Sequence, residues 1–186
     1  MSTLTLDKLN DVVKEFDLNS DNYSTFVETG TYVGDTVRSV QPYFEQVHTI
    51  EISKSLYDRF FREHPKYENV NVHLGDSTEV IVELLEKFNE TQKCVFWLDG
   101  HYSHGCTSKG EKDVPLLEEC KSIDQLYKPD EALVLIDDYR LFGVTEPEDW
   151  SEITVKNIKN CFQNFEVNEY IHPDDMFCLF IQRKGL

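Results

Sequence analysis

Short apolar runs alternate with amphipathic segments along the chain, and this alternation constrains the fold more than any other feature. The amphipathic segments carry apolar residues at helical spacing, whereas the runs are rich in β-branched and aromatic residues. We expect strands within 24–30, 47–53, 69–77, 93–100, 131–139, 165–172 and 176–184, and helices within 3–16, 33–44, 53–64, 77–89, 114–127 and 151–162. The predicted order is one helix, then five strand–helix units, then two strands.

This order predicts the architecture of the sheet. Strict strand–helix alternation favours parallel strands covered by helices on both faces. Only Pro-Asp-Asp separates the last two strands, so we expect a hairpin whose last strand is antiparallel. With 186 residues, 40% of them hydrophobic, the chain can bury one sizeable core. We expect a single domain over 1–186, with an N-terminal helix in 1–20 and a core over 24–184.

The charge balance excludes several kinds of partner. The chain has 18 basic and 35 acidic residues, a formal net charge of −17, and no basic cluster beyond Arg183-Lys184. Such a chain repels phosphate backbones and anionic membrane surfaces, so we expect no nucleic-acid partner. It also lacks an apolar run of about 18 residues, so we expect no membrane insertion.

Cysteine usage points to a reducing compartment. The five cysteines form no Cys-x-x-Cys pair, and Cys94 and Cys178 lie within apolar runs. This pattern is typical of buried thiols, not of a disulfide framework. The first residues also lack the basic and apolar segments of a secretory signal. We therefore expect a cytoplasmic location.

Acidic residues mark the carboxyl ends of the first five predicted strands. The positions are Glu28–Gly34, Glu51, Gly75–Ser77, Asp99–His101 and Asp137–Tyr139. In parallel α/β sheets these ends meet at one edge, where ligands bind near the point at which the strand order reverses. The sequence therefore predicts one site built from all five segments.

The residue types at this edge narrow the ligand. The glycine-containing turn 30–34 permits close backbone approach, but it lacks the GxxxxGK[ST] pattern of a phosphate loop and the GxGxxG dinucleotide fingerprint. Glu51, about 20 residues further on, suits ribose hydroxyls. Asp76 suits an adenine edge, and Ser77 or Thr78 is expected to cap the following helix.

In order, Glu28-x-Gly30-x-x-x-Gly34, Glu51, Asp76-Ser77 and Asp99 resemble the motifs of class I S-adenosylmethionine-dependent methyltransferases, over about residues 24–184. The resemblance implies a Rossmann-like, doubly wound α/β sheet of seven strands in the order 3-2-1-4-5-7-6. It implies S-adenosyl-L-methionine as cofactor, with its methionine part near Glu28, its ribose at Glu51 and its adenine at Asp76. The implied cofactor-binding residues are Glu28, Thr29, Gly30, Thr31, Tyr32, Gly34, Glu51, Ile52, Gly75, Asp76, Ser77 and Asp99.

The second half of the chain resembles a narrower group. Asp99 together with Asp137-Asp138-Tyr139 is similar to the metal-dependent, macrocin-type sugar O-methyltransferases and more distantly to catechol O-methyltransferases. The resemblance implies that Asp99, Asp137 and Asp138 bind Mg²⁺ or another divalent cation through hard oxygen ligands. It also implies methyl transfer to a sugar hydroxyl, for instance of a deoxysugar such as rhamnose in a glycan or glycosylated metabolite.

His101 departs from that pattern. The macrocin-type proteins have Asp-x-Asp where this chain has Asp99-Gly100-His101. A histidine titrates near neutral pH, so we expect His101 to be the catalytic base and Asp99 to act beside it. His101 as a metal ligand or as part of the acceptor loop is the alternative. A zinc site of His101, His104 and Cys106 lacks an obvious fourth ligand.

The acceptor side is less constrained by the sequence. Candidate contacts are Tyr102, Asp113, Tyr139 and Arg140, while Trp150 is either a sugar-stacking or a packing residue. The chain is short for this family, which suits an exposed small-molecule or glycan acceptor. A homodimer, or one domain of a larger glycan-building protein, is compatible with this length. The alternatives are a catechol or phenolic O-methyltransferase, a non-catalytic S-adenosylmethionine-binding module, or an oxidoreductase, against which the glycine spacing argues.

Overall fold

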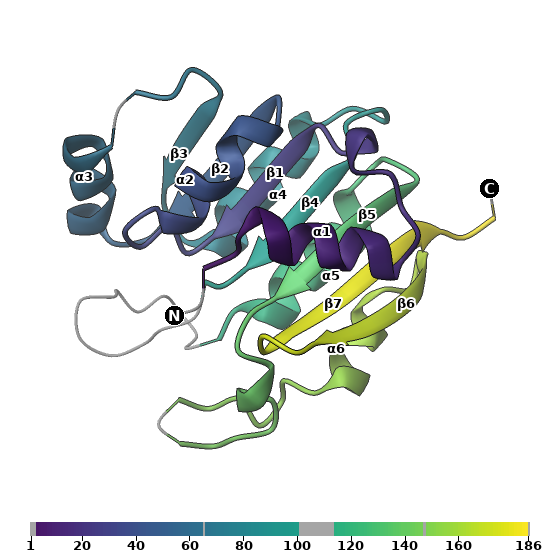
Figure 1. The fold of residues 1–186 in the computed structure, drawn as a ribbon. Coiled ribbons are helices and arrows are strands. Elements are labelled where there is room, and N and C mark those ends of the chain that lie inside the picture. The colour runs from purple at the N-terminus through teal and green to yellow at the C-terminus, as the bar shows by residue number, and fades with distance from the viewer. Residues whose placement is uncertain (1–2, 65, 101–113, 147, 186) are drawn as a thin grey trace.

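The computed structural model describes residues 3–64, 66–100, 114–146 and 148–185 (Figure 1). They form one seven-stranded sheet with the order β3-β2-β1-β4-β5-β7-β6. Strands β1 to β5 pair in parallel, and β7 runs antiparallel to both β5 and β6. The fold predicted from the sequence is therefore confirmed. The strands are β1 (Thr25–Thr29), β2 (Gln46–Glu51), β3 (Val70–Leu74), β4 (Cys94–Leu98), β5 (Glu131–Ile136), β6 (Phe165–His172) and β7 (Met176–Arg183).

Within the described ranges, three α-helices cover each face of the sheet. The helices are α1 (Leu6–Glu15), α2 (Asp35–Val40), α3 (Lys54–Glu63), α4 (Ser77–Lys87), α5 (Leu116–Leu126) and α6 (Val155–Cys161). One core cluster joins α1, α2 and α3 to strand residues such as Phe26 and Trp97. The other joins α4, α5 and α6 to the neighbouring residues Val27 and Phe96. Adjacent residues of a strand face opposite layers, so each central strand serves both cores.

Strand β4 shows why its sequence is apolar without interruption. All five of its residues are buried, because α-helices cover both faces of the sheet at this position. Phe96 and Trp97 point into different cores and have no exposed surface. Fully burying an aromatic side chain contributes about 1.5–3 kcal/mol, so this strand anchors the center of the sheet.

The sequence predicted where the helices lie better than it predicted which residues cap their N-termini. The N-cap of α4 is Asp76, whose carboxylate accepts hydrogen bonds from the backbone N–H and the hydroxyl of Thr78. The expectation that Ser77 or Thr78 caps this helix was therefore wrong. A carboxylate satisfies the free N–H groups of the first turn as well as a hydroxyl does. Ser53 does occupy the N-cap position of α3, although its side chain makes no capping hydrogen bond.

The cysteines within the described residues are buried free thiols, as the sequence predicted for Cys94 and Cys178. Burial raises the pKa of Cys94 and Cys178, and also of Cys120 and Cys161, which favours the unreactive thiol form. Among the described residues, none of the helices combines the length and the apolar character that a bilayer span requires.

Candidate functional site

The turn after β1 packs directly on the end of β4. Gly30 has φ +87°, and a Cβ atom there would lie 2.4 Å from the carbonyl oxygen of Asp99. The N–H groups of Gly30 and Thr31 both donate to the carbonyl of Ile50, at 2.9 and 3.1 Å. Only glycine combines this backbone conformation with this approach. The turn thereby brings the ends of β1, β2 and β4 together at one edge.

Gly34 closes the same turn at the start of α2. It has φ +78°, and a Cβ atom there would lie 2.6 Å from the ring of Phe60. The Gly34 N–H donates to the carbonyl of Thr31 at 2.8 Å. The two glycines thus fix a tight loop in which Tyr32 also adopts a positive φ of 48°.

Glu28 is one of several buried acidic residues at this edge, with 2% of its surface exposed. The hydroxyl of Thr49 donates to its carboxylate at 2.5 Å, and Thr31 and Thr49 share a hydroxyl–hydroxyl contact of 2.6 Å. Burial raises the pKa of Glu28 to about 8, although hydrogen bonds from the hydroxyls of Thr49 and Thr36 favour the ionised form. Glu28 lines a cavity of about 100 Å³ together with Thr3, Gly30, Thr31, Tyr32, Val33, Asp35, Thr36 and Asp99.

Glu51 joins two loops. Its carboxylate accepts hydrogen bonds from the backbone N–H groups of Tyr32 and Ser53, both at 2.8 Å. Burial raises the pKa of Glu51, against the effect of these donors. The Gly75 N–H in turn donates to the carbonyl of Glu51 at 3.0 Å, which places the β3 end beside it. Ribose binding by Glu51 stays a prediction, and the bonds seen here hold the loops around it.

An acidic cluster forms at the ends of β4 and β5. Oxygens of Asp99, Asp137 and Asp138 lie within 4.8 Å of one another, and all three residues are buried. The Asp137 N–H donates to the carbonyl of Leu98 at 3.3 Å, which holds the two strand ends together. Burial, and then the charges of Asp137 and Asp138, raise the pKa of Asp99 well above its usual range. The sequence correctly predicted this juxtaposition, and its oxygen donors suit a hard divalent cation.

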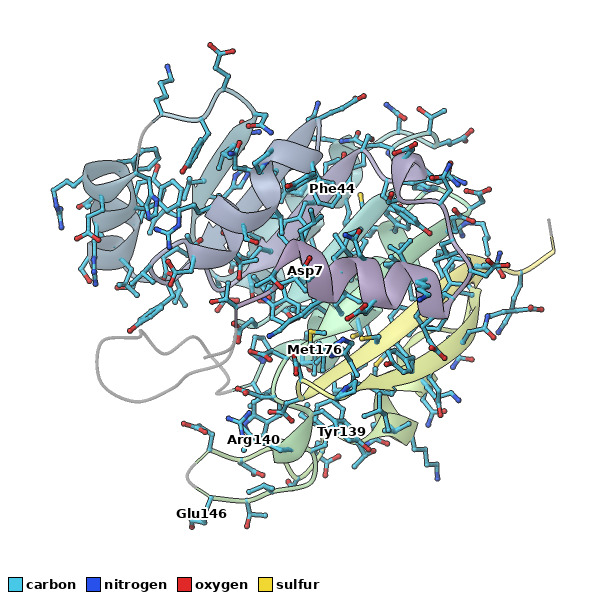
Figure 2. The ribbon with its side chains drawn as sticks, in the orientation of Figure 1. Asp7, Phe44, Tyr139, Arg140, Glu146 and Met176 are labelled. Carbon is cyan, nitrogen blue, oxygen red and sulfur yellow. The ribbon has the colours of Figure 1, made fainter. Side chains whose placement is uncertain are left out.

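Arg140 clamps this cluster to the β6–β7 turn. Its guanidinium lies 2.5 Å from Asp138 and also pairs with Asp175. The backbone N–H of Arg140 donates to the Asp175 carboxylate at 2.8 Å, and that of Tyr139 to the Asp175 carbonyl at 3.0 Å. Asp138 and Asp175 both have positive φ, as sharp turns require. Figure 2 shows Tyr139 and Arg140 on the loop after β5.

Tyr139 and Arg140 were expected to contact the acceptor. The Tyr139 ring stacks on Phe177 with centroids 5.9 Å apart and packs against the core. The Arg140 guanidinium is engaged by two carboxylates, while 58% of its side chain stays exposed. Their role toward an acceptor stays a prediction. Trp150 is buried with 3% exposure, in agreement with the packing alternative.

Several predicted residues lie outside the described residues. They are the proposed base His101 and the candidate acceptor contacts Tyr102 and Asp113, together with His104 and Cys106 of the zinc alternative.

Glu119 belongs to this edge and was missed in the sequence. It lies in the first turn of α5, is 1% exposed, and accepts hydrogen bonds from the hydroxyls of Ser77 and Thr29. Burial raises its pKa to about 7. Its Oε1 is buried with no hydrogen-bond partner among the described residues. The available signal was its spacing, three residues after Leu116 on the apolar face of α5.

Comparisons by sequence identify no relative: no protein-family model matches the chain, and no curated protein matches it. Solved structures do match. The SAH-bound methyltransferase PaMTH1 of Podospora anserina has a TM-score of 0.64 at 14% identity, over 100% of this chain and 80% of that one. A putative S-adenosylmethionine-dependent methyltransferase from Listeria monocytogenes has a TM-score of 0.58 at 12% identity. The match covers 96% of this chain and 97% of the Listeria chain.

A third match shows how widely this fold is used. The spermidine synthase of Thermotoga maritima has a TM-score of 0.55 at 13% identity over 88% of this chain. The present chain spans about half of that protein, 54% of its length. At such identities a likeness establishes the fold and leaves the chemistry to the site. The chain has the Rossmann-like fold of the class I S-adenosylmethionine-dependent methyltransferases.

Proposed function

We propose that this protein is an S-adenosylmethionine-dependent O-methyltransferase assisted by a divalent cation. The observation that carries the proposal is the convergence of Glu28, Glu51 and the acidic cluster at one edge of the sheet. The SAH-bound structure of the Podospora protein supports the choice of cofactor. The fold also serves a spermidine synthase, so the fold without the site does not select methyl transfer.

The donor-binding half of the site suits the charges of S-adenosylmethionine. That molecule carries a sulfonium and an ammonium group and no phosphate. Among the described residues, the cavity beside Gly30 is lined by the carboxyl-bearing residues Glu28, Asp35 and Asp99 and by no basic residue. A bound ammonium favours the ionised form of Glu28, whose pKa burial raises to about 8. The adenosine then extends along the loops that Glu51 holds, toward Asp76.

The oxygen donors in the other half of the site suit a divalent cation. Asp99, Asp137 and Asp138 place buried carboxylate oxygens within 4.8 Å of one another. Arg140 pairs with Asp138, and a divalent cation would favour the ionised form of Asp99, whose pKa is otherwise raised. A divalent cation bound there lowers the pKa of a coordinated hydroxyl and orients it. His101, two residues after Asp99, is proposed to accept the hydroxyl proton. The hydroxyl oxygen then attacks the sulfonium methyl group in line, and the released product is S-adenosylhomocysteine.

We propose a sugar hydroxyl, for instance of a terminal deoxysugar, as the acceptor. Two vicinal oxygens of a sugar would be suitable hard ligands for a cation held by Asp99, Asp137 and Asp138, as would the two oxygens of a catechol. A panel of free sugars, glycosides and catechols, assayed for S-adenosylhomocysteine formation with Mg²⁺ or with EDTA, separates these acceptors. Turnover of sugars alone supports the proposal, whereas turnover of catechols alone would correct the acceptor class.

Asp137→Asn tests the cation within the same assay. The amide keeps the size of the side chain and removes one charged ligand, so we expect turnover to fall at least tenfold with little change in S-adenosylhomocysteine affinity. Glu166→Gln, on the exposed side of β6, is the control. Full turnover in EDTA, or in Asp137→Asn, would remove the cation from the mechanism.

A further inference from the structure

A second cavity, of about 440 Å³, lies apart from the candidate site. It is bounded by α1, by the segment before β1 and by the segment that joins α2 to β2. It shares no lining residue with the cavity around Glu28. Figure 2 shows Phe44, one of its walls, on the face of the sheet that α1 covers. Its volume falls in the range of about 300–1,000 Å³ that small-molecule sites occupy.

The inner wall of this cavity is apolar and well packed. Leu9 and Val13 face it from α1, and Val95 faces it from β4. Tyr23 and Phe44 complete the wall, and all five residues are at most 8% exposed. The Tyr23 hydroxyl donates to the Glu131 carboxylate at 3.4 Å, and Glu131 is not among the residues that line the cavity, so this hydroxyl already has a partner. An apolar body can therefore enter without burying an unsatisfied polar group.

The rim of the cavity is acidic. Asp21 and Glu45 are exposed residues that line it, and none of the described residues lining the cavity is Lys, Arg or His. Within the described part of the chain neither carboxylate takes part in an ion pair. The Glu45 N–H donates to the Ser24 carbonyl at 2.9 Å, which ties the two rim segments together. A cation placed at this rim meets two carboxylates that have no ion-pair partner among the described residues.

We propose that this cavity is a second binding site, for a small organic cation with one aromatic or aliphatic body and one ammonium group. The body occupies the wall formed by Val13, Phe44 and Val95, and the ammonium lies at the rim near Asp21 and Glu45. An anion of the same shape is repelled by the same carboxylates. The site does not depend on the proposed methyl transfer.

The first experiment titrates the chain of residues 1–186 by calorimetry with three indoles of similar shape. Tryptamine carries an ammonium group, tryptophol is neutral and indole-3-acetate is an anion. We expect saturable binding in the order tryptamine, tryptophol, indole-3-acetate, with tryptamine binding retained in saturating S-adenosylhomocysteine. Absence of saturable tryptamine binding at millimolar concentration, equal binding of indole-3-acetate, or displacement by S-adenosylhomocysteine would overturn the proposal.

Variants then locate the bound tryptamine. Val13→Trp fills the cavity and Asn10→Trp covers its mouth from an exposed position, so each should abolish saturable binding. If Val13→Trp does not fold, tryptamine binding by Asn10→Trp decides whether the cavity is the binding site. Glu45→Gln should weaken tryptamine about two- to fivefold and leave tryptophol unchanged, as for an exposed ion pair. Glu166→Gln, away from the cavity, is the control; unchanged tryptamine binding in the blocking variants would refute the site.

Discussion

At the scale of single residues, the site depends on a few residues whose close packing or burial leaves no room for most substitutions. Gly30 lies against the Asp99 carbonyl, and Glu28 and Glu119 are carboxyl groups buried at the same edge. Burial of an ionisable group costs free energy unless the group stays protonated or gains a partner. Burying these residues therefore destabilises the fold, and such buried ionisable groups are typical of binding sites.

Gly30→Ala tests the close approach. The new methyl group would lie 2.4 Å from the Asp99 carbonyl oxygen, in a backbone conformation that disfavours alanine. We expect a loss of about 3 kcal/mol or more in the free energy of unfolding, measured with urea. The control is Gly143→Ala, where φ is +78° and no atom lies within 4 Å, so that only about 1 kcal/mol of backbone strain is expected. Equal losses in the two variants would contradict the steric account.

Glu119→Gln tests the buried acid through the pH dependence of stability. The pKa of Glu119 is raised from 4.5 to about 7, so the folded protein retains a proton that the unfolded chain releases between these values. Wild-type stability should therefore fall as the pH rises from about 4.5 to 7, by at most about 3 kcal/mol from this group.

Glutamine does not titrate, so Glu119→Gln should gain stability relative to the wild type between pH 5 and pH 8. Urea unfolding at several pH values measures this difference, with exposed Glu166→Gln as the control. Parallel stability curves for wild type and Glu119→Gln would show that Glu119 is not held as a neutral acid.

At the scale of elements, loops fixed by long-range hydrogen bonds hold the site. Glu51 holds the turn after β1, and Asp175 in the β6–β7 turn holds the loop after β5. The site residues thus come from strand ends, whereas their supports come from elements far away in the sequence. Asp76 has a structural and a proposed binding role, because it caps α4 and is expected to bind adenine.

Asp76→Ser separates these two roles. Serine is also a good N-cap, so stability should stay within about 0.5 kcal/mol of the wild type, whereas Asp76→Ala should lose about 1 kcal/mol. Both variants lose the carboxylate, so S-adenosylhomocysteine affinity by calorimetry should fall about tenfold in both. Thr154→Ala, which removes the cap of α6, should lose stability and keep its affinity. Full affinity in Asp76→Ser would leave Asp76 as a cap only.

Asp175→Asn tests the clamp on the loop after β5. Asparagine tolerates the positive φ of 66° but removes the ion pair with Arg140, so unfolding free energy should fall by about 1 kcal/mol. The neighbouring Asp174 makes only a 3.7 Å contact with Lys8 and is 55% exposed, so Asp174→Asn should cost less than about 0.5 kcal/mol. If urea unfolding ranks the two variants in the opposite order, the clamp is not a stabilising one.

At the scale of the whole molecule, the sequence was informative where local pattern decides structure. The uninterrupted apolar run Cys94–Leu98 predicted a strand buried on both faces, and the short link before Met176 predicted the antiparallel hairpin. The meeting of Asp99 with Asp137 and Asp138 followed from topology, because parallel strands end at one edge.

The local sequence pattern did not predict contacts between segments that lie far apart in the sequence. Asp175 is 35 residues from Arg140 in sequence, and no local signal joins them. The spacing of Glu119 placed it on the apolar face of α5, but nothing local indicated its hydrogen bonds with Thr29 and Ser77. The cap of α4 was misassigned because Asp, Ser and Thr are all good caps and stand in consecutive positions 76–78.

The most direct test of the central claim is calorimetric titration of the protein with S-adenosylhomocysteine, first with Mg²⁺ and then with EDTA. We expect one molecule to bind per chain in both conditions, because Glu28, Glu51 and Asp76 are proposed to hold the cofactor without the cation. Binding should be lost or severely weakened in Gly30→Ala, where the turn after β1 cannot keep its position. No binding of S-adenosylhomocysteine in either condition would contradict the account of this edge of the sheet.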